Sequence, residues 1–313
     1  MTSTKENLTK IKHLVFSGGS VWGFSLLGML MEAMDQQFLH MANIESIWAT
    51  SIGALVGIMM SLKIDPAIIR DYIVKRPWET VCKQNRFSVL EIYDGRGIIH
   101  RGFFENILEP LLTSVDLSCK TTFRELYEYN GIEIHIYATE INHYQPVDFS
   151  FKTHPDWTLI DAVYASCSIP VLFAPLIRDG KCFVDGGFLL NYPISECVKH
   201  AENENEILGI SFGNLFGTAP KEGNLNEKSS ILDVIYCFLV GIIQRHSLFE
   251  NNYSPIPYQI IIQRYTTLEY GTKVLYEKAE RERLVEKGKQ EMAEYLLKWS
   301  LIQNSQTESD SAL

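Results

Sequence analysis

The ten residues from Trp48 to Gly57 constrain the fold of this chain more than any other stretch. They follow the short apolar run 44–47 and lead into an unbroken apolar segment, Ala54 to Met60. A strand, a sharp turn and a buried helix have this pattern. Ser51 at the tip of the turn would lie over the helix N-terminus, where unpaired N–H groups favour negative charge. The sequence Ala49-Thr50-Ser51-Ile52-Gly53 therefore approaches the G-x-S-x-G of a nucleophile elbow, although a serine that merely caps a helix also fits.

A glycine-rich turn precedes this stretch and follows a predicted strand, Lys12 to Phe16. The turn is Ser17-Gly18-Gly19-Ser20-Val21-Trp22-Gly23, and a buried helix is predicted over Phe24 to Met34. A strand, a glycine turn and a helix bring several backbone N–H groups around one point. Such a turn can cradle a phosphate or form an oxyanion hole, and a purely structural turn remains a third interpretation. The spacing fits neither the dinucleotide fingerprint nor a P-loop.

These two turns belong together if their strands are parallel neighbours. A right-handed β-α-β crossover predicts this arrangement, and both loops then open at the carboxyl edge of one sheet. Ligands of open α/β sheets bind at this edge. The sequence therefore predicts that the glycine turn faces Ser51, as an acyl-transfer site requires.

A third turn, Asp185-Gly186-Gly187, ends a hairpin predicted over 176–184. An aspartate between a strand end and two glycines leaves its carboxylate at a tight turn with exposed backbone. The ordinary role of such an aspartate is to accept local N–H bonds. A catalytic role for Asp185 is the alternative.

Periodicity and capping residues predict the remaining elements. Predicted helices cover 66–76, 88–92, 101–112, 122–131, 158–166, 193–201, 229–246 and 274–299, and predicted strands cover 132–139, 145–151, 207–212 and 258–263. A surface loop is predicted over 213–228, and a disordered tail over 304–313.

Composition narrows the class of protein. The 313 residues are 46% hydrophobic and carry 28 basic and 38 acidic side chains, for a net charge of −10. This balance argues against nucleic acid as a partner and against strong attraction to anionic membranes. The polar segment 1–12 is no secretory signal, and the longest apolar runs are too short to span a bilayer. The six cysteines lack C-x-x-C spacing, so we expect reduced cysteines, no zinc site and a cytoplasmic protein.

Four segments, in order, resemble the patatin-like phospholipase family. The matches are Gly18 to Gly23 with G-G-G-x-R/K-G, Ala49 to Gly53 with G-x-S-x-G, Ala165 to Pro175 with A-S-x-x-x-P-x-x-F-x-P, and Asp185 to Gly187 with Asn191 and Pro193 with D-G-G/A-x-x-x-N-x-P. The resemblance implies a three-layer α/β/α sandwich with a mostly parallel central sheet. It places a polar N-terminal segment at 1–12, the catalytic domain at 13–212, and a helical extension packed on that domain at 213–303.

The resemblance also implies a Ser-Asp dyad without metal or cofactor. Ser51 would be the nucleophile and Asp185 the base, while N–H groups of Gly18, Gly19 and Ser20 would hold the oxyanion. Burial can raise the pKa of a carboxylate enough for it to act as a base. A triad with a late histidine, His200 or His246, is the less favoured alternative.

The chain departs from the family pattern at three positions: Ser20 replaces the third glycine of the loop, Trp22 replaces its Arg or Lys, and Ala49 replaces the first glycine of the elbow. We expect Ala49 to strain the turn. Because Trp22 removes a positive charge, we hypothesise a weaker preference for anionic phospholipids or a lower activity. Alternatively, Trp22 forms a platform at the mouth of the pocket.

The predicted function is that of a lipid acyl hydrolase, a phospholipase A or lysophospholipase type of esterase that forms an acyl-enzyme on Ser51. The loop 213–228 and the helix 229–246 are candidates for peripheral contact with a membrane, although an ordinary packed helix is the favoured interpretation of the second. A protein that binds a lipid or a partner without turnover is the main alternative. A nucleotide-binding protein is a further one, disfavoured because the P-loop lysine is missing.

Overall fold

The computed structural model describes residues 11–78, 96–213, 225, 227, 229–250, 256–264 and 266–310. The predicted segment 1–12 lies mostly outside these residues, as do nearly all of the predicted loop 213–228 and the whole helix predicted over 88–92.

The strands are β1 (His13–Phe16), β2 (Ser46–Thr50), β3 (Gly97–Ile99), β4 (Glu133–Glu140), β5 (Gln145–Phe149), β6 (Val171–Phe173), β7 (Leu176–Arg178), β8 (Lys181–Asp185), β9 (Ile207–Gly213) and β10 (Tyr258–Gln263). The helices are α1 (Gly23–Asp35), α2 (Ile52–Ser61), α3 (Pro66–Lys75), α6 (Gly102–Thr113), α7 (Phe123–Asn130), α8 (Leu159–Cys167), α9 (Ile194–His200), α10 (Ile231–Glu250), α11 (Leu268–Tyr276) and α12 (Lys278–Asp310). Short 3-10 turns at Ser20–Trp22 and Gly186–Phe188 follow β1 and β8.

An eight-stranded sheet forms the centre of the molecule, in the order β10-β9-β1-β2-β4-β8-β7, with β5 also paired to β4. The pairs from β10 to β4 are all parallel, whereas β5, β7 and β8 pair antiparallel. The predicted α/β fold with a mostly parallel sheet is confirmed. The parallel pairing of β1 with β2 brings the glycine turn and Ser51 to one edge.

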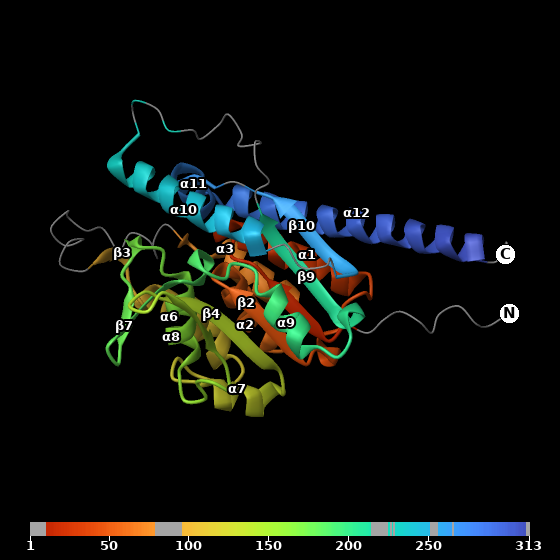
Figure 1. Cartoon of the computed structure of the whole chain (residues 1–313), viewed down its shortest axis with the longest axis horizontal. Coiled ribbons are helices and arrows are strands. Elements are labelled where there is room, and N and C mark those ends of the chain that lie inside the picture. Colours follow the sequence, from red (N-terminus) through yellow and green to blue (C-terminus); the bar gives the residue numbers. More distant parts are fainter. Residues whose placement is uncertain are drawn as a thin grey trace.

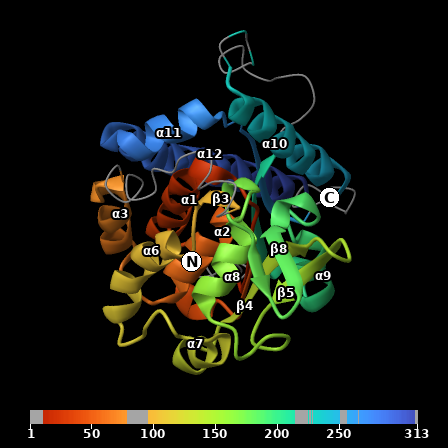
Figure 2. The same ribbon diagram turned by 90° about the vertical axis from the view of Figure 1, so that its left-hand side faces the viewer.

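Alternating side chains along the strands divide the core between the two faces of the sheet. Leu14, Phe16 and Ile47 point into the larger core, which α1, α2, α8 and α12 complete. Val15 and Trp48 point to the opposite face, where α9 packs. Figures 1 and 2 show these helices on the two sides of the sheet, which gives the three predicted layers.

The chain after the predicted catalytic domain continues the same sheet. Strand β10 pairs in parallel with β9 and forms the edge of the sheet. The long helix α12 runs across the top of the molecule in Figure 1 and packs along α1. The single helix predicted over 274–299 is two helices, α11 and α12, which are separated at Glu277.

The predicted end of this last helix and the predicted tail are corrected. Helix α12 extends to Asp310, so most of the segment 304–313 that was expected to be disordered continues the helix. The residues after Trp299 contain neither proline nor glycine to stop the helix.

The helix caps that the sequence predicts are confirmed. The Asp65 side chain accepts the Ala67 N–H at 2.8 Å, and Thr122 with Glu125 forms the predicted capping box. Gly131 ends α7 in the left-handed conformation, with φ 74°. The small sheet of β3 and β6 was not predicted. Across the described ranges, no helix is long and apolar enough to cross a membrane.

Candidate active site

Ser51 lies in the sharp turn between β2 and α2 and has a strained backbone, with φ 55° and ψ −127°. Conformations of this kind cost about 1–3 kcal/mol in a residue other than glycine. Gly53 permits the turn to pack against β1, because a Cβ there would lie 2.7 Å from the Ser17 carbonyl oxygen. Ala49 pairs with Phe16 inside the sheet, and its φ is not positive. The backbone strain that we expected at Ala49 is therefore found at Ser51 instead.

Asp185 approaches Ser51 from the end of β8. The Ser51 hydroxyl donates a hydrogen bond of 2.7 Å to Asp185 Oδ2, and the Gly187 N–H donates one of 2.7 Å to Oδ1. The carboxylate is thus both the local turn acceptor and the partner of the serine. Burial raises the pKa of Asp185 to about 6, although both hydrogen bonds act in the opposite direction. At this pKa the carboxylate is a far better proton acceptor than an exposed aspartate.

Ser166 fixes the backbone of the elbow, and the sequence interpretation did not single out its hydroxyl. It accepts the Ser51 N–H at 2.7 Å and donates to the Tyr137 carbonyl at 2.5 Å. Ser166 belongs to the segment Ala165 to Pro175, which resembles the third family motif. Its place in that motif was the signal that the sequence offered. The Ser51 N–H is consequently not a donor for an oxyanion.

The glycine turn faces Ser51. One of the three N–H groups that we expected to hold the oxyanion is already bonded within the protein. The Gly18 N–H donates to the Asn191 carbonyl at 3.1 Å, so it is not available for an oxyanion. Among the described residues, no acceptor is found for the N–H groups of Gly19 and Ser20. Ser20 adopts the left-handed conformation with φ 52°, which the third glycine of the family pattern would take easily. Ser20 therefore adopts the backbone conformation that the missing glycine would have taken.

Asn191 and Gly23 support this loop from two sides. A Cβ on Gly18 would lie 2.5 Å from Asn191 Oδ1, and a Cβ on Gly23 would lie 2.3 Å from an Ile52 side-chain carbon. Gly186 has a similar role behind Asp185, because a Cβ there would lie 2.2 Å from the Tyr137 carbonyl oxygen. The residues of the predicted motifs thus lie close together in the structure, as the resemblance to the family implied.

Two cavities meet at Ser51. A small one of about 60 Å³ contains the glycine turn, Asp185 and Arg264 in its lining. A larger one of about 410 Å³ extends from Ser51 between α2, α6 and α11 and is lined mainly by apolar and aromatic side chains, including Leu55, Met59, Phe103 and Phe104. Cys167 also lines this cavity, and its burial raises the pKa of its thiol well above the usual value. An acyl chain fits the chemistry of the larger cavity.

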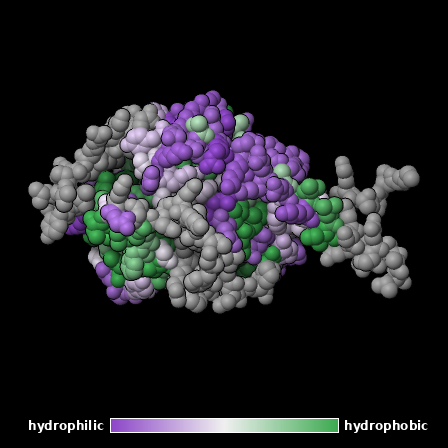
Figure 3. Space-filling model, turned by 90° about the horizontal axis from the view of Figure 1, so that it is seen from above, coloured by the Kyte–Doolittle hydropathy of each residue, from purple (hydrophilic) through white to green (hydrophobic). Residues whose placement is uncertain are grey.

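Helix α10 covers both cavities. Tyr236 lines both, and Val240 and Ile243 line the small one from the same helix face. Burial raises the pKa of the Tyr236 hydroxyl, while its hydrogen bond to Ser20 acts in the opposite direction. The outer face carries Ile231, Val234 and Phe238, which are exposed. The helix is therefore packed on one side and apolar on the other, and Figure 3 shows green apolar groups beside a hydrophilic band on this upper side of the molecule.

Trp22 lies in the wall of the small cavity and is buried. Its indole N–H donates to the Thr266 hydroxyl at 2.6 Å, and the Arg264 guanidinium lies 4.8 Å from its ring centre. Sequence reasoning missed Arg264. The signal was its place directly after β10, because a parallel strand ends at the same edge of the sheet as β1 and β2.

The histidines do not complete a triad among the described side chains. None of them lines either cavity. His200 packs against the rings of Trp48 and His13, at centroid distances of 5.2 Å and 5.9 Å. The side chain of His246 lies outside the described part of the structure.

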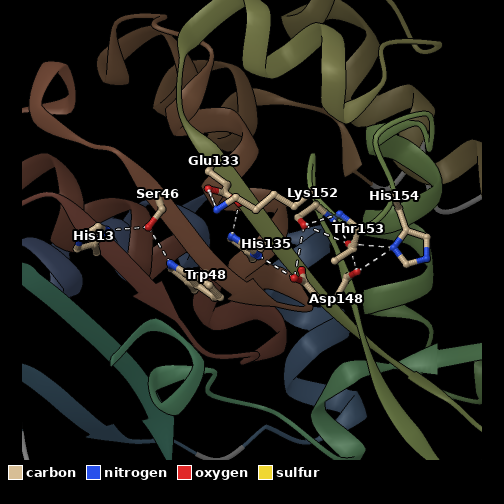
Figure 4. A network of polar contacts seen from close by, with 10 residues as sticks. His13, Ser46, Trp48, Glu133, His135, Asp148, Lys152, Thr153 and His154 are labelled. Atoms are coloured by element: carbon tan, nitrogen blue, oxygen red, sulfur yellow. Dashed lines mark hydrogen bonds and ion pairs between the residues drawn. The ribbon is translucent and has the colours of Figure 1, made fainter. Parts of the chain in front are cut away.

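A separate polar network lies on the α9 face of the sheet (Figure 4). The His135 ring stacks on Trp48 at 3.6 Å between centroids and bonds to Asp148 at 2.8 Å. Its Nε2 lies 3.1 Å from Glu133 Oε1, close enough for an ion pair but without hydrogen-bond alignment. Trp48 and His13 share the Ser46 hydroxyl. This network joins strands β1, β2, β4 and β5, away from the edge of the sheet that carries Ser51.

Comparison with known proteins identifies the class to which this fold and site belong. A family model described as patatin-like phospholipase matches residues 14–198, more than half of the chain. The chain therefore belongs to the patatin-like phospholipase family, a family of lipid hydrolases.

Two viral proteins are similar to this chain at 27% and 26% sequence identity. The chain is 27% identical over 213 residues to uncharacterized protein R571 of Acanthamoeba polyphaga mimivirus, with 68% of this chain and 69% of the relative covered. It is 26% identical over 200 residues to probable lipid hydrolase 463L of Invertebrate iridescent virus 6, with 62% and 66% covered. The chain thus spans about two thirds of the length of these relatives.

Solved structures match at still lower identity. VipD from Legionella pneumophila gives a TM-score of 0.45 at 16% identity, with 88% of this chain and 67% of VipD covered. ExoU from Pseudomonas aeruginosa, in its complex with SpcU, gives 0.48 at 13% identity, with 92% and 52% covered. These are distant likenesses of fold.

Proposed function

We propose that this protein hydrolyses carboxylic acyl esters of lipids through an acyl-enzyme on Ser51. The observation that carries the proposal is the 2.7 Å hydrogen bond from the Ser51 hydroxyl to a buried Asp185 carboxylate. A serine needs an adjacent base to act as a nucleophile at neutral pH. Membership of a lipid hydrolase family supports a lipid as the source of the ester.

In the proposed reaction, Ser51 Oγ attacks the acyl carbonyl carbon while its proton passes to Asp185 Oδ2. The N–H groups of Gly19 and Ser20 stabilise the oxyanion, and each such donor is worth roughly 100- to 1000-fold in rate. The tetrahedral intermediate collapses, and the leaving alcohol takes the proton from Asp185. Water then attacks the acyl-enzyme with Asp185 again as the base, which releases the carboxylic acid and restores Ser51.

The large apolar cavity supports a fatty acyl chain as the acid part of the substrate. It begins at Ser51 and contains no described ionisable side chain other than Cys167, Tyr236 and Tyr276. Burial of apolar carbon in such a cavity contributes about 0.8 kcal/mol for each methylene group. A medium or long acyl chain is therefore favoured over an acetyl group.

Labelling with a fluorophosphonate probe tests the proposal, because the probe reacts with activated serines only. We expect the wild type to be labelled, Ser51→Ala to be unlabelled, and Asp185→Asn to react roughly 100- to 10,000-fold more slowly because its base is lost. Ser61→Ala is the matched control, since Ser61 is a buried serine at the end of α2, the helix that begins just after Ser51, and its hydroxyl bonds to the Ile58 carbonyl. This variant should label like the wild type.

A folded wild type that stays unlabelled and cleaves no lysophospholipid would refute catalysis. The alternative, a family member that binds a lipid without turnover, would then be the better description. Retention of labelling in Asp185→Asn would refute the role of Asp185 alone.

A further inference from the structure

The C-terminal end of helix α8 holds the backbone of both Ser51 and Asp185. The Ser51 N–H donates to the Ser166 hydroxyl oxygen at 2.7 Å, and the Asp185 N–H donates to the Ser168 carbonyl at 2.9 Å. Ser166 and Ser168 are fully buried. One short segment therefore binds the two residues whose side chains share the 2.7 Å hydrogen bond of the candidate site.

Strand β4 is the point to which this segment is fastened. The Ser166 hydroxyl donates to the Tyr137 carbonyl at 2.5 Å. Tyr137 pairs with Thr50 of β2, and the next residue, Ala138, pairs with Asp185 of β8. Strand β4 thus lies between the strand that leads to the serine and the strand that ends at the aspartate. Ser166 connects the turn at Ser51 to the backbone of this middle strand.

The backbone of Ser51 needs an acceptor in this place. Its conformation, with φ 55° and ψ −127°, persists only where the surrounding structure holds it. A hydroxyl has one proton and two acceptor lone pairs. Because the proton of Ser166 is directed at the Tyr137 carbonyl, its lone pairs remain for the Ser51 N–H. Without Ser166, this buried N–H would lose its acceptor, and the turn would relax to recover one.

Ser166 acts on Ser51 and has no direct access to a substrate. The described residues that line the two cavities at Ser51 do not include Ser166, whereas the next residue, Cys167, lines the larger one. A substrate in either cavity therefore contacts other side chains. Any effect of Ser166 on a reaction at Ser51 must pass through the position of Ser51 itself.

From these contacts we infer that Ser166 is a positioning residue, whose hydroxyl holds the Ser51 backbone so that Oγ stays within hydrogen-bond reach of Asp185. The inference rests on the proposed acyl hydrolase function and adds a residue that supports its nucleophile from behind. A misplacement of reacting atoms by about 1 Å lowers a rate roughly 100-fold. Loss of the Ser166 hydroxyl should therefore lower kcat, and KM should stay unchanged because both cavities keep their lining.

Ser166→Ala tests the inference through steady-state rates on p-nitrophenyl butyrate and through the rate of fluorophosphonate labelling. We expect both kcat and the labelling rate to fall roughly 10- to 100-fold, while KM stays close to the wild-type value. Ser61→Ala is again the matched control, because it removes a fully buried hydroxyl that donates to the Ile58 carbonyl and has no contact with Ser51. It should keep the wild-type rates.

A second variant keeps the test decisive if Ser166→Ala folds poorly. Ser166→Cys preserves a side chain at this buried position, but a thiol is only a weak donor and acceptor. Its kcat should also fall, again without a change in KM. Wild-type kcat in a folded Ser166→Ala or Ser166→Cys would overturn the inference, as would a loss that appears in KM alone.

Amide hydrogen exchange keeps the inference separable from catalysis, because it needs no turnover. The Ser51 N–H should exchange roughly 10-fold faster or more in Ser166→Ala than in the wild type, and it should be unchanged in Ser61→Ala. This result would support the role of Ser166 even if the wild type cleaved no ester, which would contradict the proposed function alone. Equal exchange of the Ser51 N–H in Ser166→Ala and the wild type would overturn the inference.

Discussion

At the scale of single residues, the contacts of Asp185 show how one carboxylate can hold a turn and also serve the proposed reaction. Oδ1 accepts the Gly187 N–H, as in an ordinary aspartate turn, and this bond orients Oδ2 toward Ser51. The two interpretations of the Asp-Gly-Gly sequence are therefore not exclusive. Because the side chain is buried, the pKa of Asp185 rises to about 6, close to neutral pH.

The pH dependence of the reaction follows from this pKa. In the proposed reaction, Asp185 accepts the Ser51 proton only when its carboxylate is ionised, so kcat/KM should rise with pH through about 6 and then level off. Steady-state rates on one soluble ester across this range give the apparent pKa. A plateau that already begins near the ordinary aspartate pKa of 3.8 would contradict this assignment.

The same burial predicts a change in stability. The folded protein binds the Asp185 proton more tightly than the unfolded chain does. The stabilisation that comes from this proton is therefore complete below pH 3.8 and is lost as pH rises through about 6. Asp185→Asn should therefore lose activity but gain up to about 3 kcal/mol in the free energy of unfolding above this pH. Urea denaturation of both proteins at acidic and neutral pH measures the difference, which should vanish at acidic pH.

At the scale of elements, the contact between α1 and α12 positions the glycine turn, because α1 follows that turn directly. The two helices approach at glycines. A Cβ on Gly288 would lie 2.0 Å from the Ser25 carbonyl oxygen, and a Cβ on Gly28 would lie 2.0 Å from that of Val285. Backbone atoms cannot rotate away as the end of a side chain can. Gly288 therefore lies on the face of α12 that packs against α1.

Gly288→Ala should therefore destabilise the protein by about 1–3 kcal/mol or more, since overpacking forces the two helices apart. Gly241→Ala in α10 is the matched control, because no atom lies within 4 Å of the added Cβ. Helix propensity predicts a gain of roughly 0.5–1 kcal/mol for this control. Equal thermal unfolding temperatures for Gly288→Ala and the wild type would show that α12 does not press on α1 in this way.

At the scale of the whole molecule, the candidate site collects residues from almost the full length of the chain. Gly19, Ser51 and Arg264 follow the parallel strands β1, β2 and β10, and Asp185 ends β8. Behind this edge, the network around His135 joins the middle strands of the sheet (Figure 4). Burial alone would lower the pKa of His135, but the contacts with Asp148 and Glu133 outweigh it and raise the pKa.

This network predicts a pH dependence of the global unfolding free energy. Because the folded pKa of His135 lies above the unfolded value of 6.5, its stabilising contribution is complete below 6.5 and is lost as pH rises through the folded pKa. The destabilisation caused by His135→Gln should thus be larger near pH 6 than near pH 9. Chemical denaturation at both pH values measures it.

His40→Gln is the control, since His40 is exposed and lies outside the network. It should reproduce the wild-type trend with pH. If His135→Gln destabilised the protein equally at both pH values, packing against Trp48 rather than charge would explain the effect.

Much of the fold was predictable because its signals are local. The parallel β1-α1-β2 unit, the cap at Asp65 and the capping box at Thr122 depend on residues a few positions apart. The sequence interpretation missed the Gly97–Ile99 strand, because its partner at Val171–Phe173 is distant in the chain. It also ended α12 too early, since a polar segment without proline can continue a helix.

For the candidate site, the sequence alone determined the chemistry that is available: a serine at a strand-to-helix turn, an aspartate before two glycines, and a glycine loop. Backbone geometry and small residues impose these local turns. Only the tertiary structure decided which donors are free, because the Gly18 N–H is taken by Asn191. Only the tertiary structure also brought Arg264 over Trp22. The partners in both contacts are far apart in the chain, and their proximity depends on the order of strands in the sheet, which no local pattern records.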